Sequence, residues 1–300
     1  MRRFPLLTGP LLAALLLAAC APAPAPPPQA AAVARPAVWK LADADTTIYL
    51  FGTIHVLPTG YAWQNGPVRD AVGQAQGLVL ETLVGPDPAA VSRTMLAMGR
   101  APGLPPLLDR VPADKRAAIA ALIARSGLPL SLLDGMKTWA AALLLVGTTL
   151  TDMKLVAGEG VEPQLEAAFR ARSLPVEGLE TPAEQLGFFD TLPETAQRDF
   201  LATLADDGAT ARKDYDAMLA AWSRGDAKAI AATFDEELKE SAALRETLLV
   251  RRNARWAKWL EARLARPGTV LVAMGAGHLT GRDSVQDVLK KDGLKVVRLR

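Results

Sequence analysis

The sequence predicts an α/β protein with a mostly parallel sheet, helical crossovers and a large helical insertion. The predicted strands are short and largely apolar, as in sheets covered by helices on both faces. An amphipathic segment, 284–291, ends near Gly293 and joins two such strands, which predicts a β-α-β unit with parallel strands. The middle of the chain has helical periodicity throughout.

Five apolar runs are the predicted strands, and each is bounded by glycine, proline or polar residues. They are Thr46–Phe51, Gly77–Glu81, Leu174–Gly178, Val270–Met274 and Lys295–Leu299.

The helices are predicted from apolar residues at helical spacing and from capping signals. Thr181-Pro182-Ala183-Glu184 is a capping box with proline at the first helical position, so a helix should begin there. Trp139–Val146 is too short for a bilayer span of about 20 residues and predicts a buried core helix. The other predicted helices are Ala113–Arg125, Val161–Arg172, Glu194–Ala205, Ala211–Ser223, Ala227–Glu240 and Ala243–Ala265.

The first residues have the features of a secretion signal. Arg2 and Arg3 precede an apolar stretch that closes at Leu17-Ala18-Ala19-Cys20, which resembles the lipoprotein box of bacteria. We therefore expect residues 1–19 to be a signal peptide and Cys20 to be acylated. Residues 20–36 are rich in Ala and Pro and predict a tether, so the folded domain should span 37–300.

The expected location is the bacterial cell envelope, with the domain anchored by lipid and facing the periplasm. The absence of an acidic residue at Ala21 favours the outer membrane. Cys20 is the only cysteine, so no disulfide can form within the chain.

Charge and motifs exclude several functions. Without Arg2 and Arg3 the chain has 32 basic residues against 32 acidic ones, and this balance argues against a nucleic-acid partner. The sequence contains neither a Gly-x-Ser-x-Gly nucleophile motif nor a His-Glu-x-x-His zinc motif.

The chain's two histidines share one pattern, Gly-x-x-His. Gly52 precedes His55 and Gly275 precedes His278, and each motif directly follows a predicted strand. The carboxyl ends of parallel strands meet at one edge of a sheet, so we expect both imidazoles in a single divided site. Glycine at these positions allows the backbone to approach a bound ion or substrate closely.

Two carboxylates also lie at predicted strand ends, Glu81 and Glu180. Two imidazoles with one or two carboxylates form a ligand set for a divalent transition metal such as Zn, Mn or Co. Such an ion can polarise a carbonyl or lower the pKa of a bound water to about 7.

The chain resembles the TraB/GumN family, which is related to the Tiki membrane-anchored metalloproteases. The resemblance implies two Gly-x-x-His motifs and a glutamate at the active centre, on a sheet shared with erythromycin-esterase-like (EreA) and haem-binding ChaN-like proteins. Relatives often have Gly-Val/Ile-Asp where this chain has Gly160-Val161-Glu162, which puts a role for that carboxylate in doubt. The resemblance rests on Leu50-Phe51-Gly52-Thr53-Ile54-His55-Val56-Leu57-Pro58, on Glu81, on Gly178-Leu179-Glu180-Thr181 with Gln185, on Arg252-Asn253 followed by Trp256, and on Gly275-Ala276-Gly277-His278-Leu279 followed by Gly281.

Structural roles for the same residues stay open at this point. Glu81 could form an ion pair with a buried arginine such as Arg252, and Glu180 could be a charge favoured by the start of the helix near Thr181. Arg252 and Asn253 could lie on a solvated helix face or have a polar role near the site.

The predicted function is an envelope-anchored, metal-dependent hydrolase, most simply a peptidase acting on a peptide or protein. His55, Glu81 and His278 would be catalytic and, with Glu180, would bind the metal; Glu81 could instead be the general base. Gly52, Gly275, Arg252 and Asn253 would support the site. The alternative is a non-catalytic envelope protein that binds haem, a metal or a glycan in the same crevice.

Overall fold

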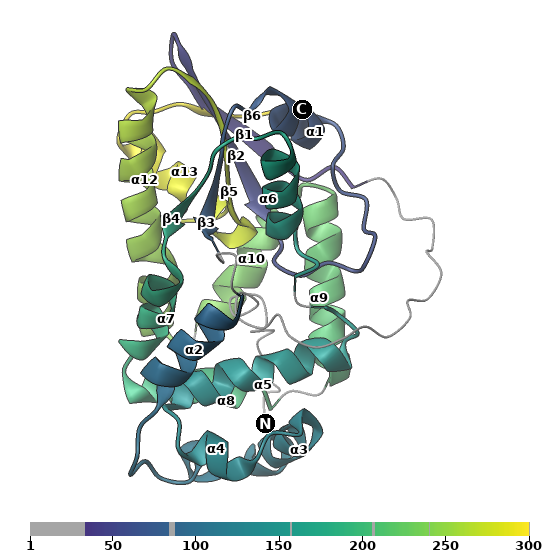
Figure 1. Ribbon diagram of the computed structural model, residues 1–300, viewed down its shortest axis with the longest axis vertical. Helices are drawn as coiled ribbons and strands as arrows, with labels where there is room; N and C mark the ends of the chain where they lie inside the picture. Colours follow the sequence, from purple (N-terminus) through teal and green to yellow (C-terminus); the bar gives the residue numbers. More distant parts are fainter. Residues whose placement is uncertain (1–33, 84–87, 157, 206–207, 240, 300) are drawn as a thin grey trace.

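The computed structural model describes residues 34–83, 88–156, 158–205, 208–239 and 241–299. Its centre is a six-stranded, mostly parallel sheet surrounded by helices, which confirms the predicted α/β class (Figure 1). The strand order is β4-β3-β5-β2-β1-β6. The strands are β1 (Val38–Ala42), β2 (Thr46–Thr53), β3 (Leu78–Thr82), β4 (Val176–Glu180), β5 (Gly268–Gly275) and β6 (Val296–Arg298).

Strand β1 was not predicted, and it is the antiparallel member of the sheet. It forms a hairpin with β2, and the Asp43 side chain closes the turn by accepting the backbone N–H of Asp45 (3.2 Å) and of Thr46 (2.8 Å). β6 pairs antiparallel with the other edge of β1. β5 and β6 therefore run in the same direction, as predicted, but β2 and β1 lie between them.

The predicted helices are present, with end points shifted by a few residues. The long helix expected over 243–265 contains a π-helical turn, η3, which joins α11 to α12. The capping box at Thr181 begins α7, as predicted. The helices are α1 (Pro67–Gln74), α2 (Pro88–Gly99), η2 (Leu107–Arg110), α3 (Arg116–Ser126), α4 (Leu130–Asp134), α5 (Thr138–Asp152), α6 (Val161–Ala171), α7 (Pro182–Asp190), α8 (Glu194–Thr203), α9 (Gly208–Ser223), α10 (Ala227–Leu238), α11 (Ala242–Arg245), η3 (Glu246–Val250), α12 (Arg251–Leu264), η4 (Ala276–Leu279) and α13 (Val285–Lys291).

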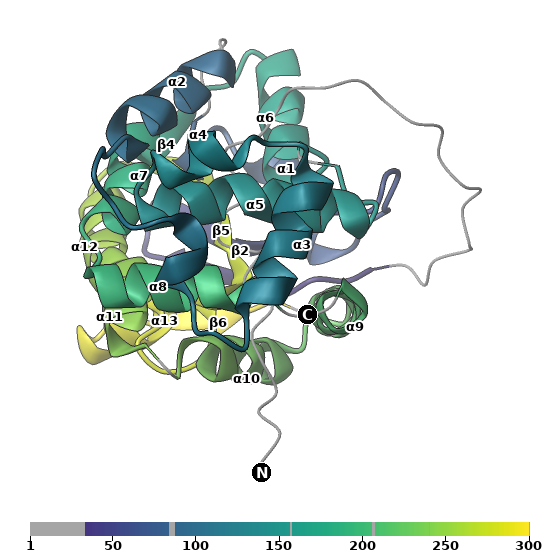
Figure 2. The ribbon, with the colours of Figure 1, turned by 90° about the horizontal axis from the view of Figure 1, so that it is seen from below.

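The helical insertion lies beyond the carboxyl ends of the parallel strands. In Figure 1 the sheet occupies the upper part of the molecule, and α2, α5 and α8 lie below it. Figure 2, seen from that side, shows α3, α4, α5 and α8 in front of the sheet. The carboxyl ends of the parallel strands therefore point toward these helices.

Apolar residues pack against both faces of the sheet. On one face Trp256 and Leu260 of α12 pack with Leu50 and Val272 of the sheet. The other face has a larger core that includes Trp139 of α5, whose side chain has no exposed area. This burial confirms that the apolar segment around Trp139 is a core helix, and no helix in the described parts of the chain is long and apolar enough to cross a bilayer.

Cys20, the predicted signal peptide and most of the tether lie outside the described residues.

Candidate functional site

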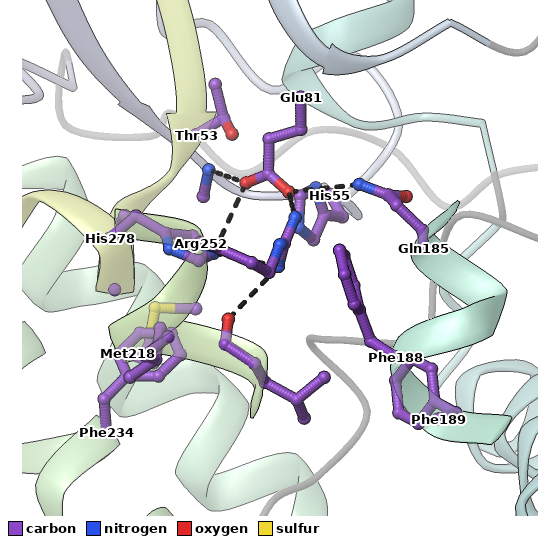
Figure 3. Close-up of a pocket in the computed structure, with 15 residues that line it drawn as sticks. Thr53, His55, Glu81, Gln185, Phe188, Phe189, Met218, Phe234, Arg252 and His278 are labelled. Atoms are coloured by element: carbon purple, nitrogen blue, oxygen red, sulfur yellow. Dashed lines mark hydrogen bonds and ion pairs between the residues drawn. The ribbon is translucent and has the colours of Figure 1, made fainter. Parts of the chain in front are cut away.

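His55, Glu81 and His278 meet at one point beside Gly275. His55 follows β2, Glu81 lies near the end of β3, and His278 lies in η4 directly after β5. A Cβ atom placed on Gly275 would lie 3.1 Å from Glu81 Oε1, 3.4 Å from His55 Nε2 and 3.6 Å from His278 Cδ2. The two imidazoles are thus within about 7 Å of each other, as expected for one divided site (Figure 3).

The glycines of both motifs make this close approach possible. β2 and β5 pair in parallel, with Gly52 opposite Met274 and Thr53 opposite Gly275. A Cβ atom on Gly52 would lie 3.1 Å from the Cα atom of Ala276. A side chain at Gly52 would push η4 away, and one at Gly275 would fill the space into which the three functional groups point.

His55 is held by a carboxylate that sequence reasoning had set aside. The ring Nδ1 lies 2.7 Å from Glu162 Oε1, and Thr53 Oγ1 donates to the same oxygen at 2.5 Å. Burial alone would lower the pKa of His55, but the charge and hydrogen bond of Glu162 outweigh it and raise the pKa to about 9. Near neutral pH the metal-free His55 therefore carries protons on both ring nitrogens.

Gly160 brings Glu162 to this position. A Cβ atom on Gly160 would lie 2.1 Å from the backbone oxygen of His55, so only glycine allows these two backbone segments to lie in contact. Val161 N donates to Ile54 O at 3.1 Å, and α6 then begins with Glu162 in its first turn. The sequence shows a glycine before a helix, but not that it rests on the His55 backbone.

His278 is fixed by Asn253 and stays neutral. Asn253 Nδ2 donates to Asp283 O at 2.7 Å, so its Oδ1 faces His278 Nδ1 at 2.6 Å and accepts the ring proton. Nε2 then accepts from Arg252 Nη1 at 3.2 Å, and Trp256 packs on the ring with centroids 4.4 Å apart. Burial lowers the pKa of His278 to about 3. Asn253 thus has the polar role near the site.

Arg252 is buried among the acidic residues of the site. Its Nη2 lies 2.6 Å from Glu81 Oε2 and 2.8 Å from Glu180 Oε2, and its Nε lies 3.1 Å from both Glu180 oxygens. Nη1 donates to Leu248 O and to His278. All five N–H groups therefore have acceptors, and the buried ion pair considered for Glu81 is present.

The two carboxylates differ in what they face. Glu81 Oε1 accepts the backbone N–H of Gly275 at 2.5 Å. Burial would raise the pKa of Glu81, but Arg252, the histidines and this hydrogen bond together lower it to about 2. Glu180 instead binds Arg252 and Arg255, the latter at 2.5 Å, and also accepts from Gln185 at 3.2 Å. Glu180 thus faces the arginines.

The donor atoms of His55, Glu81 and His278 suit a divalent ion. Two ligand atoms on one tetrahedral ion with bonds of about 2.1 Å lie about 3.4 Å apart, and His278 Nε2 lies 3.7 Å from Glu81 Oε1. Among the described residues, however, no group of three or more His, Cys, Asp or Glu side chains has a metal-binding arrangement. Arg252 Nη1 donates to His278 Nε2 at 3.2 Å, so an ion bound to that nitrogen would take the place of this N–H.

The comparison with protein families matches the TraB/PrgY/gumN family over residues 37–298. This chain belongs to the TraB/PrgY/gumN family. Neither the curated proteins nor the solved structures gave a match. Membership covers nearly the whole described domain, so both Gly-x-x-His motifs lie inside the TraB/PrgY/gumN region.

Sequence reasoning missed the role of Thr53 and the apolar wall of the site. Thr53 lies inside the first Gly-x-x-His motif, and its contact with Glu162 depends on the position of α6. The wall comes from helices whose apolar residues resemble ordinary core residues in the sequence. Its members are Phe188, Phe189, Met218, Phe234, Leu248 and Leu249.

Proposed function

We propose that this TraB/PrgY/gumN protein is a metal-dependent hydrolase that cleaves peptide bonds, with His55, Glu81 and His278 holding the ion. The observation that supports it is the convergence of these side chains beside Gly275, with both Nδ1 atoms fixed by oxygen acceptors. Metal-binding histidines usually have such an acceptor on the second ring nitrogen, which leaves the first turned toward the ion.

The bound ion would polarise the peptide carbonyl and lower the pKa of a water molecule. Arg252, the histidines and the Gly275 N–H lower the pKa of Glu81, so its carboxylate is ionised near neutral pH and can serve as a ligand. Arg252 Nη2 donates to Glu81 Oε2 at 2.6 Å, so Arg252 positions this carboxylate.

The substrate would be a peptide or protein of the cell envelope. In this proposal Cys20 carries the lipid anchor, and the domain faces the periplasm, with the outer membrane favoured because Ala21 is not acidic.

The test combines metal analysis with cleavage of a peptide library before and after chelation, and after addition of Zn, Mn or Co. We expect chelation to abolish cleavage and one of these metals to restore it. His55→Ala, Glu81→Gln and His278→Ala should each lower the rate at least about 100-fold. Glu236→Gln, whose side chain is 45% exposed on α10, is the control. Normal melting and full activity in all three site variants would place the active site elsewhere.

Non-catalytic binding is the other outcome of this test. If the protein binds haem, a metal or a glycan but hydrolyses no peptide with any added metal, it is a binding protein and not an enzyme. The convergence of two imidazoles and a carboxylate beside Gly275 is the reason that hydrolysis is proposed first.

A further inference from the structure

The pocket above the candidate site has two chemically different parts. Its floor consists of polar groups, namely His55, Glu81 and His278 at the strand ends and Arg252 on α12. Its wall comes from the helical side: Phe188 and Phe189 of α7, Met218 of α9, Phe234 of α10, and Leu248 and Leu249 of η3. Figure 3 shows Phe188 on one side of Arg252, and Met218 and Phe234 on the side of His278.

We infer that this wall is a subsite for an uncharged aliphatic side chain of the substrate, next to the bond that is cleaved. The inference rests on the proposed hydrolase function, and it names the class of peptide that the site accepts.

Charge is the first argument. None of the wall side chains is charged. The wall therefore offers no ion-pair partner to a charged group. A charged substrate side chain would lose its water here without gaining a partner, whereas an aliphatic side chain gains from burial.

Size is the second argument. The space of about 40 Å³ open to the centre of a water molecule corresponds to about three waters. The wall is also fixed: the ring of Phe188 packs 5.3 Å from the Arg252 guanidinium and 5.2 Å from that of Arg255. Phe234 lies so close to Gly277 that a Cβ atom there would be 2.7 Å from its ring. We expect this space to take side chains of about valine to leucine size.

The experiment uses the metal-loaded protein and peptides randomised on both sides of the cleaved bond, with the products sequenced. We expect Val, Ile or Leu to be preferred at one of these positions by at least 10-fold over Asp, Glu, Lys and Arg. Phe234→Ala should extend the preference to Phe and Tyr, because it enlarges the pocket. Phe234→Glu should shift it toward Lys and Arg. Phe234 is only partly buried, so both variants should fold, and their melting temperatures are measured alongside.

Leu130→Ala, a surface leucine of α4 that is 40% exposed, is the matched control and should leave the preference unchanged. Cleavage without a preference, or with a preference for charged side chains, would overturn the subsite while the hydrolase proposal stands.

A binding measurement separates the subsite from the reaction. N-acetyl-leucinamide should perturb the NMR signals of Met218 and the wall phenylalanines at millimolar concentration. N-acetyl-aspartamide and N-acetyl-lysinamide should not, and Phe234→Glu should abolish the leucinamide effect. If leucinamide binds selectively but no peptide is cleaved, the hydrolase proposal fails and the subsite holds. If leucinamide leaves these signals unchanged, the subsite is refuted whatever the activity.

Discussion

Each functional group of the candidate site is held by a neighbouring polar side chain. Glu162 and Thr53 orient His55, Asn253 orients His278, and Arg252 binds both carboxylates. Such neighbours fix the orientation and the charge of the groups that meet the substrate.

Replacing Glu162 tests its role as a positioning residue. Glu162→Gln keeps the size of the side chain but removes the charge that makes the His55 imidazole a better ligand. We expect metal affinity, measured by isothermal titration calorimetry, to fall about 10- to 100-fold. Glu166→Gln, in the next turn of α6, changes an ion pair with Arg170 and should bind metal normally. Equal affinity in the wild type and Glu162→Gln would show that Glu162 does not support His55.

The same pair predicts a pH dependence of stability in metal-free protein. The folded pKa of His55, about 9, lies above its ordinary value of about 6.5. The contribution of the His55–Glu162 ion pair to the free energy of unfolding is therefore fully present below pH 6.5 and is lost as the pH rises to about 9. Urea unfolding with chelator present should show the stability difference between wild type and Glu162→Gln shrinking over this range. A difference that stays constant from pH 6 to 9.5 would contradict the proposed ion pair.

Arg252 should matter to folding as well as to the site. Arg252→Met leaves Glu81 and Glu180 without their buried guanidinium, and breaking such a pair typically costs about 3–5 kcal/mol. Arg251→Gln is the matched control, since that neighbouring side chain is 71% exposed and pairs only at the surface. The free energies of unfolding from urea titrations give the comparison. A loss below about 1 kcal/mol for Arg252→Met would show that the buried charges do not depend on it.

At the scale of elements, the helices and strands that could be predicted from the sequence are those marked by local signals. The capping box at Thr181 and the apolar strand of Val270–Met274 are examples, because burial and end capping leave a pattern in neighbouring residues. β1 was missed because its five residues follow the Ala/Pro-rich segment and pair antiparallel at the far side of β2. The contact of Glu162 with His55 joins residues distant in the sequence, and no local pattern encodes it.

Replacing Gly160 tests how the start of α6 is positioned against the segment that contains His55. Gly160→Ala would put a methyl group 2.1 Å from the His55 carbonyl oxygen, so the start of α6 must move away and take Glu162 with it. We expect about 1–3 kcal/mol of lost stability and weaker metal binding, measured by thermal melting and calorimetry.

Gly187→Ala is the control for this change. Gly187 lies inside α7 with no atom within 4 Å of an added Cβ, so alanine there should be neutral or slightly stabilising. If Gly160→Ala has a normal melting temperature and normal metal affinity, the contact between the Gly160 and His55 backbone segments is not needed for stability or for metal binding.

At the scale of the whole molecule, the sheet provides the polar floor and the helical insertion provides the apolar wall. This division follows from placing the insertion beyond the carboxyl ends of the strands. The reactive groups could be found from the sequence because strand ends are predictable. The wall could not, since it depends on how four helical elements pack.

The proposed location is also a property of the whole chain. Cys20→Ser should move the protein from the membrane fraction to the soluble periplasmic fraction, because the acyl chains that a lipoprotein cysteine carries are needed for stable anchoring. Thr8→Ser, in the same segment, should leave the fractionation unchanged. A Cys20→Ser protein that stays in the membrane fraction at wild-type levels would contradict lipid anchoring.

Strand β5 follows β2 and β3 at a long distance in the sequence, yet it lies between them in the sheet. β2 and β3 therefore lack their shared neighbour until β5 has been synthesised, and sheet closure depends on contacts between distant residues. His278 arrives with the same strand. A chain truncated before Gly268 would lack both the centre of its sheet and its second imidazole, so an incomplete translation product would contain no assembled site.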